Sequence, residues 1–243
     1  MRFLREVVDT ILPAGCSVCG AFPDADGKIS FPVPSGFHIC FNCLSEIIPQ
    51  PSDKRFFPCL SEPFTGDPCA GLALYMPYTY KGFFEKAVPR VKFKSKPELA
   101  SFMGILLGRL MKRDGITADV IVPIPLSDKR FKERGYNQAA LIAQEVSRIA
   151  GVPMLENLLT RNRDTLRQTE ITDSFQRSTN VSGAFDASED FDFEGTNVII
   201  LDDVATTGNT LHEAATTLKN RGVSKILCVA VCGNRAVLNC EPY

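Results

Sequence analysis

The feature that most constrains the fold is an alternation of short apolar segments with segments of helical periodicity. The predicted strands are 119–122, 197–201 and 225–231, with a further short strand near 153–159. The predicted helices are 97–113, about 137–150 and about 210–221. Because short apolar strands that alternate with helices are typical of a parallel sheet covered on both faces, the sequence predicts an α/β fold.

The length of 243 residues suits one medium α/β domain and a small appendage, and 44% hydrophobic content with 23% charge is ordinary for a protein with a core. We expect residues 1–70 to form an N-terminal helix and a small loop-rich module, and residues 71–243 to form the α/β domain. The apolar stripe in 1–12 predicts a helix that docks on the chain's own core, and a membrane-surface or partner helix is the alternative.

The charge is unevenly distributed along the chain. The formal net charge of −1 argues against a generally basic nucleic-acid binder. Residues 81–177 nevertheless hold 18 Lys and Arg against 11 Asp and Glu, a net charge of +7, and the rest of the chain carries −8. Such a division can attract anions to the middle of the chain. The anion could be a phosphate, pyrophosphate or nucleic acid.

Two C-x2-C pairs, Cys16 with Cys19 and Cys40 with Cys43, stand 20 residues apart. Four thiolates at this spacing can close a tetrahedron around Zn²⁺, and such a closed site is structural rather than catalytic. His38 could replace one thiolate, although a neighbouring loop histidine is the plainer interpretation.

The remaining cysteines carry weaker signals. Cys59 and Cys69 are single, so ordinary half-buried thiols and a second, incomplete metal site both stay open. Cys228 and Cys232 fall on or just after a predicted core strand and are predicted to be small buried residues. The chain has nine cysteines, no secretory signal and no apolar run that could span a bilayer, which together predict a reducing, cytoplasmic location.

The strand 197–201 leads into Asp202 and Asp203 and then into a loop of small and hydroxyl residues before the next helix. Two adjacent carboxylates beside a buried strand are costly unless they meet cations or hydroxyl groups. Gly208 can take a positive φ, and the N–H groups at the following helix start can bind an anion. The combination predicts a sugar-phosphate site, for which an N-capped helix after an acidic turn is the plainer alternative.

The segment 198–211 resembles the diphosphoribose-binding signature of type I phosphoribosyltransferases, in which apolar residues precede two acids and a T-T-G-x-T loop. Other short motifs follow one another in the order 78–82, 91–94, 122–126, 134–138, 161–168 and 180–185. This succession is similar to the ComF family of competence-associated, phosphoribosyltransferase-like proteins with an N-terminal zinc module. The resemblance extends from Cys16 to about Val231 and implies a type I phosphoribosyltransferase-like fold.

The resemblance also implies roles for individual residues. Asp202 and Asp203 would hold the ribose hydroxyls of phosphoribosyl diphosphate, directly or through Mg²⁺. The 5-phosphate would be bound by Ala205, Thr206, Thr207, Gly208, Asn209 and Thr210. The diphosphate side would be lined by Pro123, Ile124 and Pro125, whose turned backbone could offer N–H groups.

Four basic residues are candidates for neutralising the departing pyrophosphate, namely Lys92, Lys94, Arg130 and Arg134. The Lys-Phe-Lys pattern at 92–94 is also what a solvated strand edge would show. The polar segment 161–177 is predicted to be a flap over the site or a mobile loop.

Two functions stay open at this point. The first is a phosphoribosyltransferase-like protein that binds phosphoribosyl diphosphate with Mg²⁺ and supports natural competence, with or without group transfer. The second is a single-stranded DNA-binding competence factor, working with DNA-uptake proteins, that keeps the sugar-phosphate site. The sequence identifies no acceptor.

Overall fold

The computed structural model describes residues 15–21, 37–57, 72–94, 96–161 and 183–234. The predicted helix at 1–12, Cys59 and Cys69, and residues 162–177 of the predicted flap lie outside these ranges. The predicted domain boundary between residues 70 and 71 also falls outside them. Within the described ranges, no helix combines the length and the apolar character needed to cross a bilayer.

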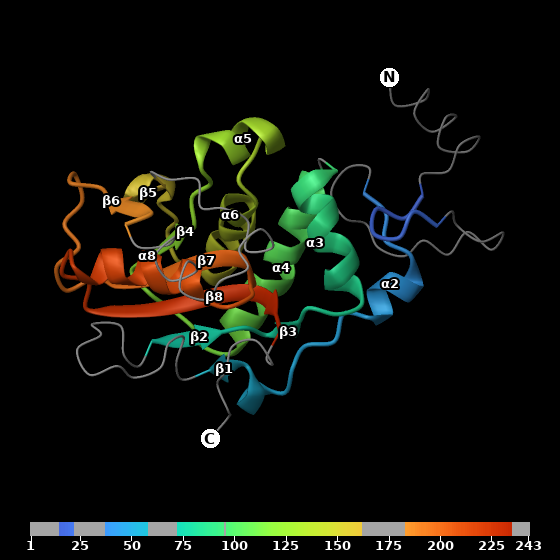
Figure 1. Ribbon diagram of the computed structural model, residues 1–243. Helices are drawn as coiled ribbons and strands as arrows, with labels where there is room; N and C mark the ends of the chain where they lie inside the picture. The colour runs from blue at the N-terminus through green and yellow to red at the C-terminus, as the bar shows by residue number, and fades with distance from the viewer. Residues whose placement is uncertain (1–14, 22–36, 58–71, 95, 162–182, 235–243) are drawn as a thin grey trace.

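A six-stranded sheet lies at the centre of the described structure (Figure 1). Its strands are β1 (Phe56–Phe57), β2 (Ala73–Tyr75), β3 (Tyr78–Thr79), β4 (Val120–Pro123), β7 (Asn197–Ala205) and β8 (Lys225–Gly233). The order is β1-β2-β8-β7-β4, and β3 also pairs with β8. Only the β1–β2 pair is antiparallel among these pairings, so the predicted parallel α/β fold is confirmed.

Helices cover both faces of the sheet. They are α3 (Phe83–Phe93), α4 (Pro97–Arg113), α5 (Asp128–Arg134), α6 (Gln138–Ala150) and α8 (Asn209–Lys219). Ile199 and Leu201 of β7 belong to the core that contains α3, α4 and α6, whereas Val198 and Ile200 belong to the core that contains α8. Because consecutive residues of a strand point to opposite faces of the sheet, β7 contributes side chains to both cores.

Most of the predicted elements are present at the predicted places. The helix predicted over about 97–113 is confirmed as α4, and the helix predicted from about 137 begins at Gln138. Asn137 caps it, because its Oδ1 accepts a hydrogen bond of 3.1 Å from the N–H of Ala139. The sequence did not predict α3 or α5.

The predicted strand at 153–159 is wrong. Met154 forms a single parallel bridge with Ile121, after which the chain enters a 3₁₀ turn, η2 (Glu156–Leu158). Glu156 and Asn157 of that turn are exposed, and the pairing with the main sheet does not continue into the turn. β5 (Leu159–Arg161) then pairs with β6 (Phe185–Ala187) in a separate two-stranded sheet.

The described N-terminal segments pack on α3 and α4. They include the short helix α2 (Phe41–Ser45) and the 3₁₀ turn η1 (Ser52–Lys54). The Phe37 ring lies 5.8 Å from the Phe102 ring of α4, and Lys86 Nζ of α3 lies 2.7 Å from Glu46 Oε1. These contacts place the N-terminal segments against the same helices that cover one face of the sheet (Figure 1).

Candidate functional site

β7 is longer than predicted and carries the acidic pair within the strand. Its pairing with β8 continues through Val204 with Cys232 and Ala205 with Gly233. The expectation that the strand ends at the two acids is therefore wrong, because β8 extends far enough to pair with the residues beyond them. Asp202 and Asp203 consequently have a fixed backbone, and their side chains follow the alternation of the strand.

This alternation separates the two carboxylates. Asp203 continues the set of Ile199 and Leu201, on the face covered by α3, α4 and α6, and Asp202 continues the set that faces α8. The pocket at the start of α8 is accordingly lined by Asp202. We conclude that the two acids, which the sequence treats as a pair, have different surroundings.

Asp203 forms an ion pair with Lys92 of α3. Lys92 Nζ lies 3.0 Å from Asp203 Oδ2, and the two side chains are 25% and 7% exposed. No other donor within the described ranges reaches that oxygen. Burial would lower the pKa of Lys92, but the carboxylates of Asp203 and Asp202 outweigh it and raise the pKa, so the lysine stays charged.

The carboxyl group of Asp202 is strongly affected by its surroundings. Burial, followed by the neighbouring charge of Asp203, raises the pKa of Asp202 to about 7. Its Oδ1 accepts a hydrogen bond of 2.8 Å from the N–H of Asp203. A carboxylate that is costly to ionise in isolation is stabilised by a cation or by hydroxyl donors, which is the chemistry of a polyhydroxyl or metal-bound ligand.

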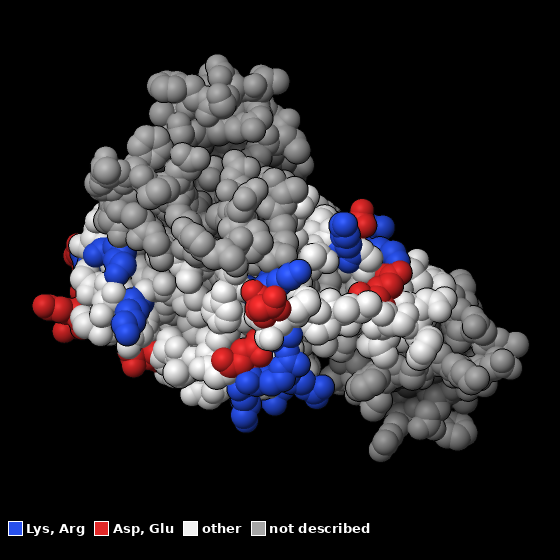
Figure 2. Space-filling model, turned by 90° about the horizontal axis from the view of Figure 1, so that it is seen from below, with Lys and Arg blue, Asp and Glu red and all other residues white. Residues whose placement is uncertain are grey.

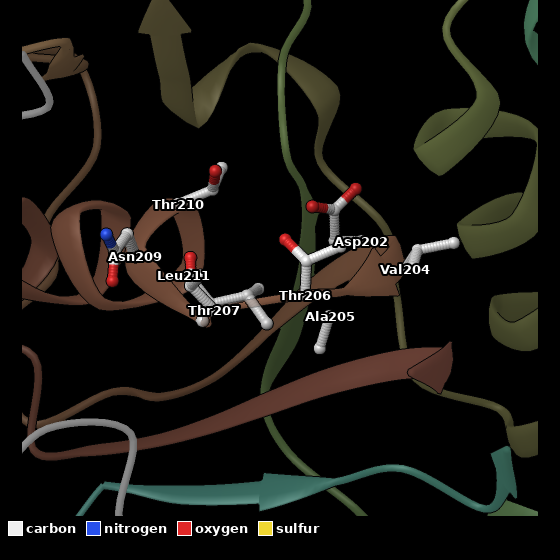
Figure 3. Close-up of a pocket in the computed structure, with 9 residues that line it drawn as sticks. Asp202, Val204, Ala205, Thr206, Thr207, Asn209, Thr210 and Leu211 are labelled. Atoms are coloured by element: carbon white, nitrogen blue, oxygen red, sulfur yellow. The ribbon is translucent and has the colours of Figure 1, made fainter. Parts of the chain in front are cut away.

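The loop 205–208 and the start of α8 form a small pocket beside Asp202, which we call the cradle (Figure 3). Asp202 and Thr206 lie on one side of it, with Asn209 and Thr210 on the other. Gly208 has a φ of 79°, a conformation that residues with side chains rarely adopt.

The N-terminus of α8 has no side-chain cap. The N–H groups of the first helical turn therefore lack the partner that a capping side chain would supply. Together with the threonine hydroxyls and the helix dipole, they make the cradle suited to a phosphate group. The structure thus brings together all seven residues predicted from Asp202 and from 205–210 at one place.

The loop after β4 lies beside the end of β7, but it cannot donate in the way predicted. Pro123 and Pro125 have no N–H group, and the N–H of Ile124 donates to Leu201 O at 2.8 Å. Asn137 Nδ2 also donates to Ile124 O at 3.0 Å. The prediction that these three residues offer N–H groups to the diphosphate is therefore wrong. The backbone groups of Ile124 are used instead in hydrogen bonds to β7 and to the cap of α6.

The other basic candidates lie on and around α5. Arg134 Nη1 donates to Gln138 Oε1 at 2.9 Å, and its guanidinium carbon lies 5.6 Å from the centre of the Phe93 ring. Burial is the main effect on Arg134 and lowers its pKa, although the negative charge of Asp203 acts in the opposite direction. Gln138 was not among the residues predicted for the site, because Arg134 ends α5 and Gln138 begins α6, so that no helical spacing relates them.

Lys94 and Arg130 occupy more open positions. Lys94 follows the end of α3 and is exposed, and Arg130 is half-buried on α5. The alternative interpretation of 92–94 as a strand edge is wrong, because Lys92 and Phe93 belong to a helix. α5 also exposes 50% of Phe131 between Arg130 and Lys132, so its surface is both basic and aromatic.

The four cysteines of the two C-x2-C pairs lie close together. Their Sγ atoms all fall within 4.8 Å of one another, and the Cys19 and Cys40 sulfurs are 3.7 Å apart. A zinc tetrahedron with Zn–S distances of about 2.3 Å has edges of about 3.8 Å. The residues therefore fit a four-thiolate zinc site, and His38 is not part of the cluster.

The backbone around the cluster favours a thiolate at Cys16. Burial opposes ionisation, but N–H groups that include those of Cys40 and Val18 hold the pKa of Cys16 at about 7. Burial and the neighbouring thiols raise the pKa of Cys43 instead. A cation at the centre would resolve this crowding, since metal binding deprotonates the thiols. Cys228 and Cys232 are buried on β8, as predicted.

Comparison with known proteins agrees with this geometry. Residues 105–238 match the family described as "Phosphoribosyl transferase domain". The chain is 38% identical over 109 residues to Competence protein F of Haemophilus influenzae, covering 44% of this chain and 47% of that protein. It is 34% identical over 146 residues to Competence protein ComFC of Bacillus subtilis, covering 60% and 57%. It is 29% identical over 150 residues to DNA utilization protein YhgH of Escherichia coli O157:H7, covering 60% and 65%.

The alignments span about half to two thirds of the length of these relatives. The domain match alone covers more than half of the present chain and includes β7, the cradle, α8 and β8. The sheet with its flanking helices and the four-cysteine cluster agree with the same assignment. The chain therefore belongs to the ComF family and carries a phosphoribosyl transferase-type domain.

Proposed function

We propose that this protein binds phosphoribosyl diphosphate at the end of β7 and uses this binding in the uptake or use of DNA. The observation that carries the first part is the juxtaposition of Asp202 with the cradle. A carboxylate that could accept hydrogen bonds from ribose hydroxyls stands next to an uncapped helix start that is suited to phosphate. The second part is supported by the names of the relatives, which refer to competence and to DNA utilization.

The diphosphate would extend from the sugar towards the loop after β4 and towards α5. Because Pro123, Ile124 and Pro125 have no N–H group to offer, Arg130 and Arg134 are the groups we propose for the diphosphate. Guanidinium groups suit phosphate oxygens through paired hydrogen bonds. Lys92 forms an ion pair with Asp203 and contributes positive charge to the same region.

Mg²⁺ is the cofactor that we propose to accompany the diphosphate. Mg²⁺ usually binds through one or two carboxylates together with substrate phosphates. Asp202 fits this role, because its carboxyl group has a raised pKa and a cation would favour its ionised form. When bound, the metal would supply positive charge to the diphosphate, and Asp203 would remain paired with Lys92.

Calorimetric titration of the protein with phosphoribosyl diphosphate and Mg²⁺ tests the proposal. We expect saturable binding that Asp202→Ala combined with Asp203→Ala abolishes. The matched control is Glu189→Ala combined with Asp190→Ala, which removes the same charge from two exposed acids between β6 and β7 and should leave the affinity unchanged. Equal weakening by both double variants would show a general charge effect and would contradict the proposal.

A second function, binding of single-stranded DNA, is favoured by the surface of α5. Its exposed Phe131 is flanked by basic residues, and aromatic rings among cations are typical of sites for single strands. The protein as a whole is not basic, since its formal net charge is −1, and the face in Figure 2 shows Lys and Arg next to Asp and Glu. We therefore propose α5 as the contact surface rather than the whole molecule.

The affinity for a fluorescent oligothymidylate, measured by anisotropy over a range of salt concentrations, tests this second function. We expect binding that weakens steeply with salt, because released counterions drive phosphate contacts. Lys129→Gln combined with Lys132→Gln should weaken it and flatten the salt dependence. Absence of binding at low salt would exclude this function without affecting the first.

A further inference from the structure

Gln138, the first residue of α6, is a buried polar residue with only part of its amide group in use. It is 2% exposed, and its Oε1 accepts the hydrogen bond of 2.9 Å from Arg134 Nη1. Within the described ranges, its Nε2 has no hydrogen-bond partner. Since a buried donor without an acceptor lowers stability, the group is explained if a ligand supplies the acceptor.

The free atom is the amide N–H group rather than the amide oxygen. Arginine has donors and no acceptor, so the atom that faces Arg134 Nη1 must be the oxygen of Gln138. Among the residues that the structure describes, the other buried side-chain atom without a hydrogen bond is Asp203 Oδ2, which faces the ammonium group of Lys92. No described residue compensates Gln138 Nε2 in this way, and the donor therefore suits an acceptor oxygen such as that of a phosphate.

Two hydrogen bonds hold the start of α6 beside the end of β7. Asn137 Nδ2 donates to Ile124 O at 3.0 Å, and the N–H of Ile124 donates to Leu201 O at 2.8 Å. The residue before Gln138 is thereby connected to the residue before Asp202. A ligand at Asp202 that extends towards the loop after β4 would therefore approach the start of α6.

Arg134, the partner of Gln138, lies within the electrostatic range of both acids. Burial lowers the pKa of Arg134, and the negative charges of Asp203 and Asp202 oppose this effect. Its guanidinium carbon also lies 5.6 Å from the centre of the Phe93 ring. The contacts with Gln138 and Phe93 restrict the directions that the guanidinium can take, and a group that is already ordered loses less entropy when it binds an anion.

The turn that joins α5 to α6 is held by contacts that do not involve the side chain of Gln138. Gly135 ends α5 with a φ of 77°, a conformation that favours glycine. Tyr136 donates a hydrogen bond from its hydroxyl to Val91 O of α3, and Asn137 caps α6. A substitution at Gln138 should therefore leave the backbone of the turn in place.

We propose that Gln138 is both the positioning residue for Arg134 and a direct donor to the diphosphate. Its amide oxygen directs the guanidinium, and its amide N–H donates to an oxygen of the same anion. The inference deepens the first proposed function and rests on it. It adds a neutral, buried donor to the two arginines, so that the diphosphate is recognised by the direction of hydrogen bonds as well as by charge.

Calorimetric titration with phosphoribosyl diphosphate, inorganic pyrophosphate and ribose 5-phosphate, each with Mg²⁺, tests the proposal. Gln138→Met, which has a similar length and no polar donor, should weaken binding of the first two ligands by at least about tenfold, since a hydrogen bond to a charged group is lost. Binding of ribose 5-phosphate, which has no diphosphate, should be unchanged. Gln138→Met should also unfold thermally at the wild-type temperature or above it, because it no longer buries a donor without a partner. Gln144→Met, at an exposed position of the same helix, is the matched control and should leave all three affinities unchanged.

Gln138→Glu separates the two roles, because it keeps an acceptor for Arg134 and lacks the amide N–H. It should weaken binding of phosphoribosyl diphosphate at least as much as Gln138→Met does, and an unchanged affinity would overturn the donor role. Equal weakening of all three ligands by Gln138→Met, together with a lower Tm, would assign Gln138 a structural role and would overturn the proposal. Unchanged binding of the two diphosphate ligands by Gln138→Met would also overturn it, while the first function would stand. Absence of phosphoribosyl diphosphate binding by the wild type would instead overturn the first function.

Discussion

The two adjacent carboxylates at the end of β7 point to opposite faces of the sheet and therefore have different surroundings. Asp203 is buried and paired with Lys92, so its charge is compensated by the protein itself. Asp202 faces the cradle, and its Oδ1 accepts a hydrogen bond from the N–H of Asp203. Burial, followed by the charge of Asp203, raises the pKa of Asp202, so that a cation or hydroxyl donors from a bound ligand would stabilise its ionised form.

Asp202→Asn should change the pH dependence of stability. The folded-state pKa of about 7 exceeds the ordinary value of 3.8, so the folded protein holds the extra proton between about pH 4 and pH 7. The contribution of this group to stability is therefore present at low pH and is lost as the pH rises through 7. Thermal unfolding should be measured for both proteins at pH 5.5 and at pH 8. The Tm of the asparagine variant minus that of the wild type should be a few degrees higher at pH 8 than at pH 5.5. A difference that does not depend on pH would show that the Asp202 pKa is not raised.

Lys92→Met should destabilise the protein by about 1–3 kcal/mol, because it leaves the buried Asp203 without its cation and the pair is partly open to water. Urea unfolding measures this loss. Lys94→Met, on an exposed side chain two residues further on, should stay within about 0.5 kcal/mol of the wild type. Asp203→Asn should restore much of the stability lost in Lys92→Met, and a failure to do so would contradict the ion-pair explanation.

At the scale of helices and strands, the sequence predicts what depends on periodicity and capping. The helix 97–113, the cap at Asn137 and the core strands β4, β7 and β8 follow from such local signals. α3 was not predicted, because Pro89 lies within it and the Lys-Phe-Lys pattern at its end also suits a strand.

The candidate site shows the same division. The cradle follows from its motif, whereas the Lys92–Asp203 pair joins residues more than a hundred positions apart and depends on the docking of α3. The hydrogen bond between Ile124 and Leu201 likewise depends on strand register, which no motif specifies.

The contact between α4 and α6 depends on glycine. A Cβ atom at Gly104 would lie 2.6 Å from the backbone oxygen of Ile142. Because the clash is with backbone, a change of side-chain rotamer cannot remove it. Gly104→Val should therefore cost more than about 2 kcal/mol in chemical denaturation, because the helices must separate. Arg109→Ala, on the exposed face of α4, serves as the control and should change stability by less than about 0.5 kcal/mol. Equal effects of the two changes would argue against close packing at Gly104.

At the scale of the whole molecule, the cysteine cluster and the sheet are linked through α3 and α4. Cys16 and Cys43 belong to the same apolar core as Phe83 and Phe102. α3 also carries Lys92, so a metal ion held by the cluster would support, at a distance, the helix that carries the partner of Asp203. Loss of the metal is therefore expected to affect the candidate site as well as the N-terminal segments.

Zinc analysis should find one ion for each chain, and removal by a chelator should lower the Tm by several degrees, because structural zinc contributes directly to folding. Cys16→Ser should reduce the bound zinc, whereas Cys228→Ser, on a buried cysteine of β8, should retain one ion for each chain. Full zinc content in Cys16→Ser would contradict the assignment of the cluster.

The central claim is that the end of β7 and the start of α8 recognise a phosphorylated ribose that carries a diphosphate. Calorimetric titration of the intact wild-type protein with phosphoribosyl diphosphate, compared with ribose 5-phosphate, tests it most directly. The account predicts saturable binding of one phosphoribosyl diphosphate for each chain and weaker binding of ribose 5-phosphate, which lacks the groups proposed to contact Arg130 and Arg134. No heat of binding for phosphoribosyl diphosphate at millimolar concentration, with and without Mg²⁺, would contradict it.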